Sequence, residues 1–315
     1  MFSINKKNVL LITFFCFTQL ASKSELYYSN RVVVISIPKA GTHMLTKCVS
    51  LFKQPGLSVA YTKEPKASKD DLDKIDKQNQ LPPPNNFKGR YFYADVGHLP
   101  PLCQHLANPT KGRLFWTHWP HTKKFEDFIK SKTQANFFLI RDPRDVIVSM
   151  AHMLQKNPRG TESVDPVSLM WDFIDARQKN YIKWGVEIHE AYPLFYDLGV
   201  VGFYKMYLPW LATKKVMTVK FEDLVGSQGD GDDAAQYQTI KNMAQHIGTK
   251  LTNAEIQEIQ QQLFGGTGTF REGKIGSWRK YFTQEMVTAF KKTPEACQLL
   301  ITLGYEKNNS WGLDR

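Results

Sequence analysis

A single lysine stands at the tip of a tight turn in "RVVVISIPKAGTHML", residues 31–45. Lys39 follows an apolar, β-branched run, and a helical pattern begins just after Gly41. A strand that turns directly into a helix presents backbone N–H groups and the positive end of the helix dipole, and both favour an oxyanion. Gly41 lets the backbone approach that anion, and Lys39 adds a full charge. The stretch predicts a phosphate-type anion site; taken alone, a solvated turn lysine explains it equally well.

A second stretch, "FFLIRDPRDVIVSMAHM" (137–153), places Arg141 at the carboxyl end of a strand and Ser149 inside the helix that follows. Ligands of open α/β sheets bind beyond the carboxyl ends of the strands. An arginine there suits bidentate contact with a phosphate, and a serine hydroxyl can add another hydrogen bond. The alternative is an Arg141 that pairs with a carboxylate and a Ser149 that faces solvent.

Two further stretches carry candidate chemistry. "TFREGKIGSWRKYFT" (269–283) is rich in glycine and cations and includes Trp278, which we expect to be buried. "WTHWP" (116–120) ends a short strand at His118. A histidine can take a proton near neutral pH, so His118 is a candidate base. The alternative for His118 is a hydrogen-bonded core histidine, and His43, His98, His121 and His152 are weaker candidates for the base.

Buried strands alternate with helices along the chain. We expect strands at 31–37, 112–120 and 136–140, a strand and turn at 215–224, and helices at 42–53, from Pro143, at 166–184 and at 235–247. We expect loops at 62–89 and 225–236. This alternation predicts an α/β fold in which helices flank a central parallel sheet, with one domain over 25–315.

Composition narrows the partners. The 315 residues carry a formal net charge of +11, which favours anionic partners or simply solubility. The cations are scattered and no RNA-binding signature occurs, so we expect no nucleic-acid partner. The cysteines, Cys16, Cys48, Cys103 and Cys297, show no metal-binding spacing and form no disulfide framework.

The N-terminal residues 1–24 have the layout of a secretory signal peptide. Lys6 and Lys7 precede a short apolar stretch, Val9 to Phe17, and small residues follow. This predicts an exported or secretory protein without a stable membrane span, because the apolar stretch is too short to cross a bilayer comfortably. The alternative is an N-terminal helix that packs on the domain of a cytoplasmic protein.

Together, the three basic stretches resemble, in order and spacing, the sulfotransferases that use 3′-phosphoadenosine 5′-phosphosulfate (PAPS). "PKAGTHML" is similar to that family's 5′-phosphosulfate loop, usually PKSGTTW. "FLIRDPRDVIVSMAH" is similar to its 3′-phosphate-binding strand and helix, and "FREGKIGSWRKYFT" to its RKGxxGxWKxxFT segment. The resemblance implies a P-loop-like three-layer fold and PAPS as co-substrate, with no metal.

The resemblance also implies roles. Lys39 would bind the leaving oxygens, Arg141, Ser149 and Arg271 would hold the 3′-phosphate, and His118 would be the base for a hydroxyl, or less favourably an amine, of a small-molecule or glycan acceptor. The residues it assigns to the donor are Lys39, Ala40, Gly41, Thr42, His43, Met44, Arg141, Ser149, Phe221, Arg271, Glu272 and Gly273.

Four positions depart from the family pattern. Met44 stands for the tryptophan that stacks on adenine, and Phe221 for a tyrosine. Trp116 stands for the lysine two residues before the histidine, and Glu272 for the lysine after Arg271. The adenine pocket is therefore altered and one cation is lost.

Two other functions are compatible with parts of the sequence. A P-loop kinase or NTPase is suggested by "GTFREGKI" (268–275), although Ile275 replaces the Ser/Thr that binds magnesium and no apolar strand precedes it. A catalytically inactive nucleotide-binding protein of the same fold is suggested by the altered adenine pocket. The acceptor is not specified; we expect its gates at 60–90, 152–166 and 225–236, and aromatic residues either in its pocket or in the core: Trp116, Trp119, Phe92 and Tyr93.

Overall fold

The structure is a computed structural model, and it describes residues 31–52, 57–62, 112–155, 165–174, 193–267 and 270–313. The expected signal peptide lies outside the described residues, as do Cys103, His98, Phe92, Tyr93 and nearly all of the expected loop 62–89.

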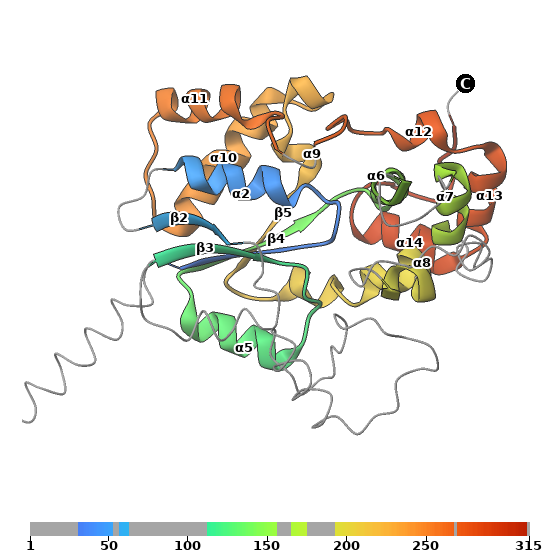
Figure 1. Ribbon diagram of the computed structural model, residues 1–315, viewed down its shortest axis with the longest axis horizontal. Coiled ribbons are helices and arrows are strands. Elements are labelled where there is room, and N and C mark those ends of the chain that lie inside the picture. The colour runs from blue at the N-terminus through green and yellow to red at the C-terminus, as the bar shows by residue number, and fades with distance from the viewer. Residues whose placement is uncertain are drawn as a thin grey trace, which may run out of the picture.

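A parallel sheet forms the centre of the described fold (Figure 1). Its five strands lie in the order β2-β3-β1-β4-β5, and every neighbouring pair is parallel. The strands are β1 (Val32–Ser36), β2 (Leu57–Thr62), β3 (Gly112–Thr117), β4 (Ala135–Ile140) and β5 (Val216–Lys220). The predicted parallel sheet is confirmed.

The two central strands explain why the sequence shows apolar runs rather than alternation. Every residue of β1 and β4 is buried, because β1 lies between β3 and β4 and helices cover the sheet. Edge strand β5 is less covered, and only Val219 in it is fully buried.

Helices cover both faces of the sheet. Figure 1 shows α2 and α10, with α11 beyond them, on one side and α5 on the other, while α6, α7 and α12 to α14 gather at one end. The helices are α2 (Thr42–Leu51), α5 (Lys123–Lys132), α6 (Pro143–Gln155), α7 (Pro166–Ile174), α8 (Pro193–Lys205), α9 (Phe221–Leu224), α10 (Asp233–Ile247), α11 (Asn253–Leu263), α12 (Trp278–Tyr281), α13 (Gln284–Lys291) and α14 (Pro294–Thr302), with 3-10 turns η2 (Leu208–Ala212) and η3 (Ser227–Gly229). This is the predicted three-layer α/β fold.

Most predicted boundaries within the described residues agree within a few residues, and α6 does begin at Pro143; residues 175–184 of the expected helix 166–184 lie outside the described residues. The prediction of a loop over 225–236 is wrong in part. Asp232 accepts a hydrogen bond from the Ala235 N–H (2.8 Å) and so starts α10 at Asp233, inside the expected loop. Polar residues that cap a helix are easily mistaken for a loop, because the same types favour both.

A buried arginine ties α6 to the C-terminal end of the chain. Arg144 lies against the rings of Trp278 (4.1 Å) and Trp311 (4.6 Å). Its guanidinium donates to carboxylate oxygens of Asp142 (2.6 Å) and Glu306 (2.6 Å). The helix that begins just after β4 is therefore held in place by residues near the end of the sequence.

Candidate active site

The first loop joins β1 to α2 in an unusual backbone conformation. Lys39 and Gly41 both have positive φ, 68° and 105°, and the Ala40 N–H closes the turn on the Ile37 carbonyl (3.0 Å). Gly41 begins α2 without a side-chain cap. Because the first N–H groups of a helix have no intrahelical partner, this end of α2 can receive an anion.

Gly41 is required at its position by its neighbour as well as by its φ. A Cβ on Gly41 would lie 2.6 Å from Cδ2 of Phe221, the first residue of α9. The Phe221 ring also contacts Arg141, whose guanidinium carbon lies 4.1 Å from the ring centroid. Phe221 thus packs between the first loop and the arginine predicted to bind phosphate.

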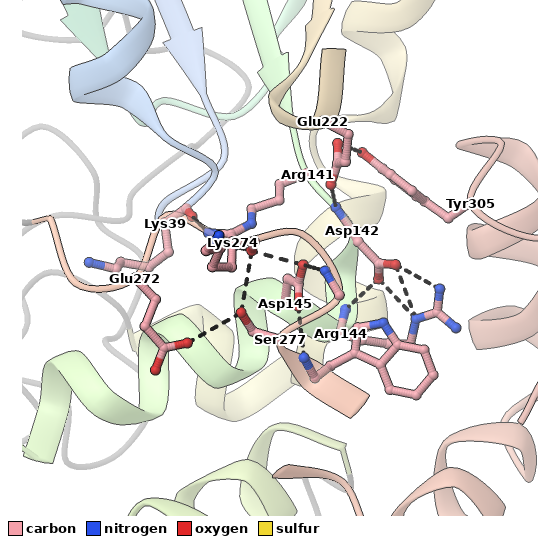
Figure 2. Close-up of polar contacts among 12 residues, drawn as sticks. Lys39, Arg141, Asp142, Arg144, Asp145, Glu222, Glu272, Lys274, Ser277 and Tyr305 are labelled. Carbon is pink, nitrogen blue, oxygen red and sulfur yellow. Dashed lines mark hydrogen bonds and ion pairs between the residues drawn. The ribbon is translucent and has the colours of Figure 1, made fainter. Parts of the chain in front are cut away.

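Arg141 connects the first loop, between β1 and α2, to the basic stretch at 269–283, which is the third basic segment. Its Nη1 donates to the Lys39 carbonyl (3.4 Å) and its Nη2 to the Lys274 carbonyl (2.8 Å), as Figure 2 shows. Asp145 Oδ2 lies 3.7 Å from Nη2, so the alternative of a carboxylate partner for Arg141 also holds. Arg141 is 8% exposed, and it organises the site besides offering charge to a ligand.

Asp145 fixes the third basic segment through two backbone hydrogen bonds. Its buried carboxylate accepts the N–H of Gly276 (2.8 Å) and of Trp278 (2.9 Å). Burial raises the pKa of Asp145 to about 6, while the neighbouring Arg141 opposes that rise. Sequence reasoning did not single out Asp145, because these partners lie more than a hundred residues further along the chain.

His118 follows β3 and is held in one tautomer. Its Nδ1 lies 2.9 Å from the carbonyl oxygen of Ser36 and 3.1 Å from the Ser36 hydroxyl. A carbonyl only accepts, so Nδ1 carries the proton and Nε2 keeps its lone pair. The Tyr207 hydroxyl donates to the His118 carbonyl (2.5 Å) and fixes the backbone there. The ring can therefore take a proton through Nε2.

The site concentrates positive charge. Burial, followed by the charges of Arg141 and Arg271, lowers the pKa of Lys39 to about 8. Burial lowers the pKa of His118 to about 4; the hydrogen bond to the Ser36 carbonyl opposes the shift, and the charges of His43 and Lys39 add to it. The pKa of His43 is lowered by burial and by Lys39. An anion placed among these groups would relieve their mutual repulsion.

One cavity of about 180 Å³ unites the predicted residues. Every residue assigned to donor or catalysis lines it except Ala40. Ala40 is fully buried, and its N–H bonds to the Ile37 carbonyl within the turn. Its methyl group therefore faces the core and does not line the cavity.

The cavity also has lining residues outside the predicted donor and catalytic set. They are Trp116, Met153, Val225, Leu263, Phe264, Gly265, Thr267, Phe270 and Ser277. Of these, Trp116 was expected in the acceptor pocket or the core, Met153 and Val225 lie in the expected acceptor gates, and the others were not singled out. The rings of Phe264 and Phe270 meet edge to face with centroids 5.1 Å apart, and Phe270 is 42% exposed. The two phenylalanines flank the glycine-rich stretch "GGTGT", and this position was the one sign in the sequence that their rings could lie at a site.

Trp116 separates the two cavity histidines. Its ring centroid lies 5.8 Å from that of His43 and 5.1 Å from that of His118. The other described histidines have structural partners: His121 Nε2 lies 2.8 Å from Glu126 Oε2, the His152 ring packs on Tyr281, and His246 Nε2 lies 3.0 Å from the Asn136 carbonyl oxygen. Trp119 packs partly buried against the core.

The structure argues against a P-loop at 268–275. Lys274, which would have to face phosphates, does not line the cavity and pairs with Asp230 (2.8 Å). Within the described residues, α11 precedes this segment instead of a strand, and the segment leads through turns into α12. The interpretation as a P-loop NTPase is therefore wrong.

Within the described residues, no helix is both long and apolar enough to cross a membrane. No group of three or more His, Cys, Asp or Glu in that part of the chain could hold a metal ion.

Comparison with known proteins places the chain in a family. Residues 29–300 match the family described as "Sulfotransferase domain". Sulfotransferase 6B1 of Danio rerio is 24% identical over 208 residues, which are 60% of this chain and 60% of that protein. Sulfotransferase 2A1 of Mus musculus is 22% identical over 269 residues, covering 83% of this chain and 81% of that one. The chain thus matches about three fifths of the length of the first relative and four fifths of the second.

A solved structure has the same fold. The crystal structure of mouse sulfotransferase SULT7A1, complexed with PAP, aligns with a TM-score of 0.55 at 15% identity, over 87% of this chain and 85% of that one. The family match extends over most of the chain and includes all the cavity residues described above. The chain belongs to the sulfotransferase family.

Proposed function

We propose that this protein transfers a sulfuryl group from PAPS to the hydroxyl of an acceptor, with His118 as the general base. One observation carries the proposal: Lys39, Arg141 and Arg271 line the same cavity as a histidine whose Nε2 is free to accept a proton. The PAP bound in the mouse structure supports a nucleotide of this type.

The donor would be held by the residues that converge on the cavity. Lys39 and the N-terminal end of α2 would contact the phosphosulfate, because a helix start and a lysine together favour an anion. Arg141, Ser149 and Arg271 would hold the 3′-phosphate by charge-assisted hydrogen bonds. Met44 and Phe264 would provide apolar contact for the flat base, in place of a tryptophan.

The chemical step follows from these positions. His118 Nε2 takes the acceptor hydroxyl proton while the acceptor oxygen forms a bond to sulfur. The bond between sulfur and the bridging phosphate oxygen breaks, so the products are a sulfate ester and adenosine 3′,5′-bisphosphate (PAP). Lys39 stabilises the charge that develops on the leaving oxygen, as fixed cations do in the related phosphoryl transfers.

The low pKa of His118 suits this role in one respect. In the protein without donor, the pKa of about 4 keeps the imidazole neutral and able to accept a proton. The negative charge of a bound donor beside Lys39 would raise the pKa of both groups, which strengthens the base once the complex has formed.

The acceptor side is lined by large side chains. Trp116 and Met153 line the cavity, and Trp116 contacts the His118 ring. A small molecule with a flat or apolar body next to its hydroxyl fits such a wall better than an amine, which would add a cation to a positive site. A glycan acceptor is the alternative.

Two measurements test the proposal. Labelled PAPS offered to a panel of phenols, alcohols, amines and glycans should give transfer to hydroxyl acceptors. Calorimetry should show that PAP binds far more tightly than AMP, which lacks the 3′-phosphate. Equal affinity for the two nucleotides would refute the roles of Arg141, Ser149 and Arg271, and PAP binding without transfer to any acceptor would favour the inactive-protein alternative.

A further inference from the structure

The third segment brings a carboxylate into the cationic cavity. Among the described residues that line the cavity, Glu272 alone is acidic. It stands where the sulfotransferase pattern has a lysine, and it is joined to Arg271, a predicted ligand of the 3′-phosphate. Glu272 Oε1 lies 2.7 Å from Arg271 Nη1, with the two side chains 31% and 25% exposed.

Glu272 is held in this position from two sides. The Tyr281 hydroxyl donates to Oε1 (3.1 Å), and the Ser277 hydroxyl donates to Oε2 (3.4 Å), the latter drawn in Figure 2. Arg271 Nη1 also donates to the Tyr281 oxygen (3.2 Å). The carboxylate is therefore part of a small network and is not a freely moving surface side chain.

In this network Glu272 already pairs with Arg271, a cation that the nucleotide would need. Lys39, Arg141 and Arg271 all line the cavity, and Glu272 offsets part of their charge through Arg271. A phosphate that approaches Arg271 meets a guanidinium already bonded to a carboxylate, and it is repelled by that carboxylate at short range. Binding thus requires Arg271 to exchange or share its internal partner.

Building on the proposed function, we propose that Glu272 is an internal counter-ion that competes with the bisphosphate nucleotide for Arg271 and thereby speeds release of the product PAP. Competition of this kind acts mainly on dissociation, because short-range contacts change residence time more than encounter rate. Product release limits turnover in many enzymes, so a built-in competitor has a direct kinetic effect. Glu272 is thus a residue that tunes product affinity.

The test compares Glu272→Gln with a matched control. Gln keeps the shape and removes the negative charge; its single amide oxygen can still accept from Tyr281, while its NH2 group takes the place of the oxygen that faces Ser277. The control is Asp127→Asn on α5, where the carboxylate pairs with Lys123 (2.6 Å) in an exposed pair and does not line the cavity. Both variants raise the net charge by the same amount, so their difference isolates the local effect.

PAP binding is measured by calorimetry and its dissociation by stopped flow, at low and at physiological salt. We expect Glu272→Gln to bind PAP about two- to fivefold tighter, the size of effect that a partly exposed ion pair allows, mostly through slower dissociation. The gain should shrink as salt rises, because screening weakens the removed repulsion. Asp127→Asn should match the unaltered protein, and Glu272→Lys should bind at least as tightly as Glu272→Gln.

The outcomes separate this proposal from the proposed function. If the unaltered protein binds PAP but Glu272→Gln binds it no more tightly, or Asp127→Asn gains as much, Glu272 is not a competitor. A gain in Glu272→Lys without one in Glu272→Gln would also refute the competition, because it would reflect a new contact from lysine. If neither the unaltered protein nor Glu272→Gln binds PAP, the proposed function fails, and this proposal with it.

Discussion

Replacing Gly41 with alanine tests whether the first loop, Phe221 and Arg141 form one packed unit. The new Cβ would lie 2.6 Å from Cδ2 and 3.2 Å from Cε2 of Phe221, where real contacts are at least 3.4 Å in most cases. Phe221 is 4% exposed, and the sides of its ring are taken up by the first loop, Arg141 and the cavity. To make room, the ring must move into the cavity or push against the Arg141 guanidinium, 4.1 Å from its centroid, and either movement disturbs the site.

The magnitude has two parts. An alanine at φ +105° costs about 1–2 kcal/mol of backbone strain, and overpacking a buried ring costs about 1–3 kcal/mol more. We therefore expect Gly41→Ala to lower the free energy of unfolding by about 2–5 kcal/mol. Because a displaced Arg141 loses its bonds to the Lys39 and Lys274 carbonyls, PAP affinity should fall at least about tenfold, equivalent to about 1.4 kcal/mol.

Urea unfolding and calorimetry with PAP measure the two effects. The matched control is Gly276→Ala, because Gly276 also has a positive φ, +68°, but a Cβ there would meet no atom within 4 Å. It should cost about 1 kcal/mol and no more than backbone strain explains. A double variant with Phe221→Ala should recover part of the Gly41→Ala loss if the ring is the obstacle. If Gly41→Ala costs no more stability than Gly276→Ala and keeps full PAP affinity, the packing account is wrong.

Four further predictions concern the groups that would do the chemistry. Lys39→Ala should slow transfer from labelled PAPS by about 100- to 1,000-fold, the usual loss for one preorganised donor, with thermal unfolding nearly unchanged; full activity would return Lys39 to a solvated turn residue. His118→Ala should lower turnover about 100- to 10,000-fold while PAP affinity in calorimetry stays nearly constant; loss of PAP binding or of folding would make His118 structural. The pKa values set the pH dependence: kcat/KM should fall only as pH approaches about 4, where free His118 is protonated, and again above about 8, where Lys39 loses its charge. Since the pKa of His118 drops from 6.5 when unfolded to about 4 when folded, the free energy of unfolding of the unaltered protein relative to His118→Gln should fall as pH drops through that window; a pH-independent difference would contradict the buried neutral ring.

The predicted acidic limb of kcat/KM differs from what the sequence alone suggests, which is a limb near the ordinary pKa of histidine. Burial in this site moves that limb lower, because solvent is withheld from the charged form and His43 and Lys39 add repulsion. A sequence motif identifies the type of residue, but the solvent exposure and charges that set its pKa come from the folded structure.

The sheet was predictable because its central strands carry a local signal. The β-branched run of β1 and the apolar run of β4 are unbroken since both strands are buried on two faces, and Pro143 marks the start of α6. The basic stretches were also recognisable from local sequence, because each is a contiguous segment. The signal peptide over residues 1–24 stays a prediction, because those residues lie outside the described part of the chain.

The rest depends on contacts between distant residues. The role of Asp145 exists only because Gly276 and Trp278 fold back onto it, and no local pattern indicates that pairing. The same holds for Ala40, whose motif position suggests a ligand contact although its methyl group packs into the core. Phe264 and Phe270 reach the cavity through a glycine-rich turn that has no periodicity to interpret.

The way Arg141 joins the first loop to the Lys274 carbonyl has a consequence during synthesis. The first loop and the α6 segment leave the ribosome long before residues 270–278, so a growing chain carries Lys39 and Arg141 before it carries Arg271. Ligand binding stabilises only chains that can bind, so under the proposed function the nucleotide would give no protection to nascent or prematurely terminated chains. A chain would gain that protection only once residues 270–278, and the residues near Glu306 and Trp311 that hold α6, have folded.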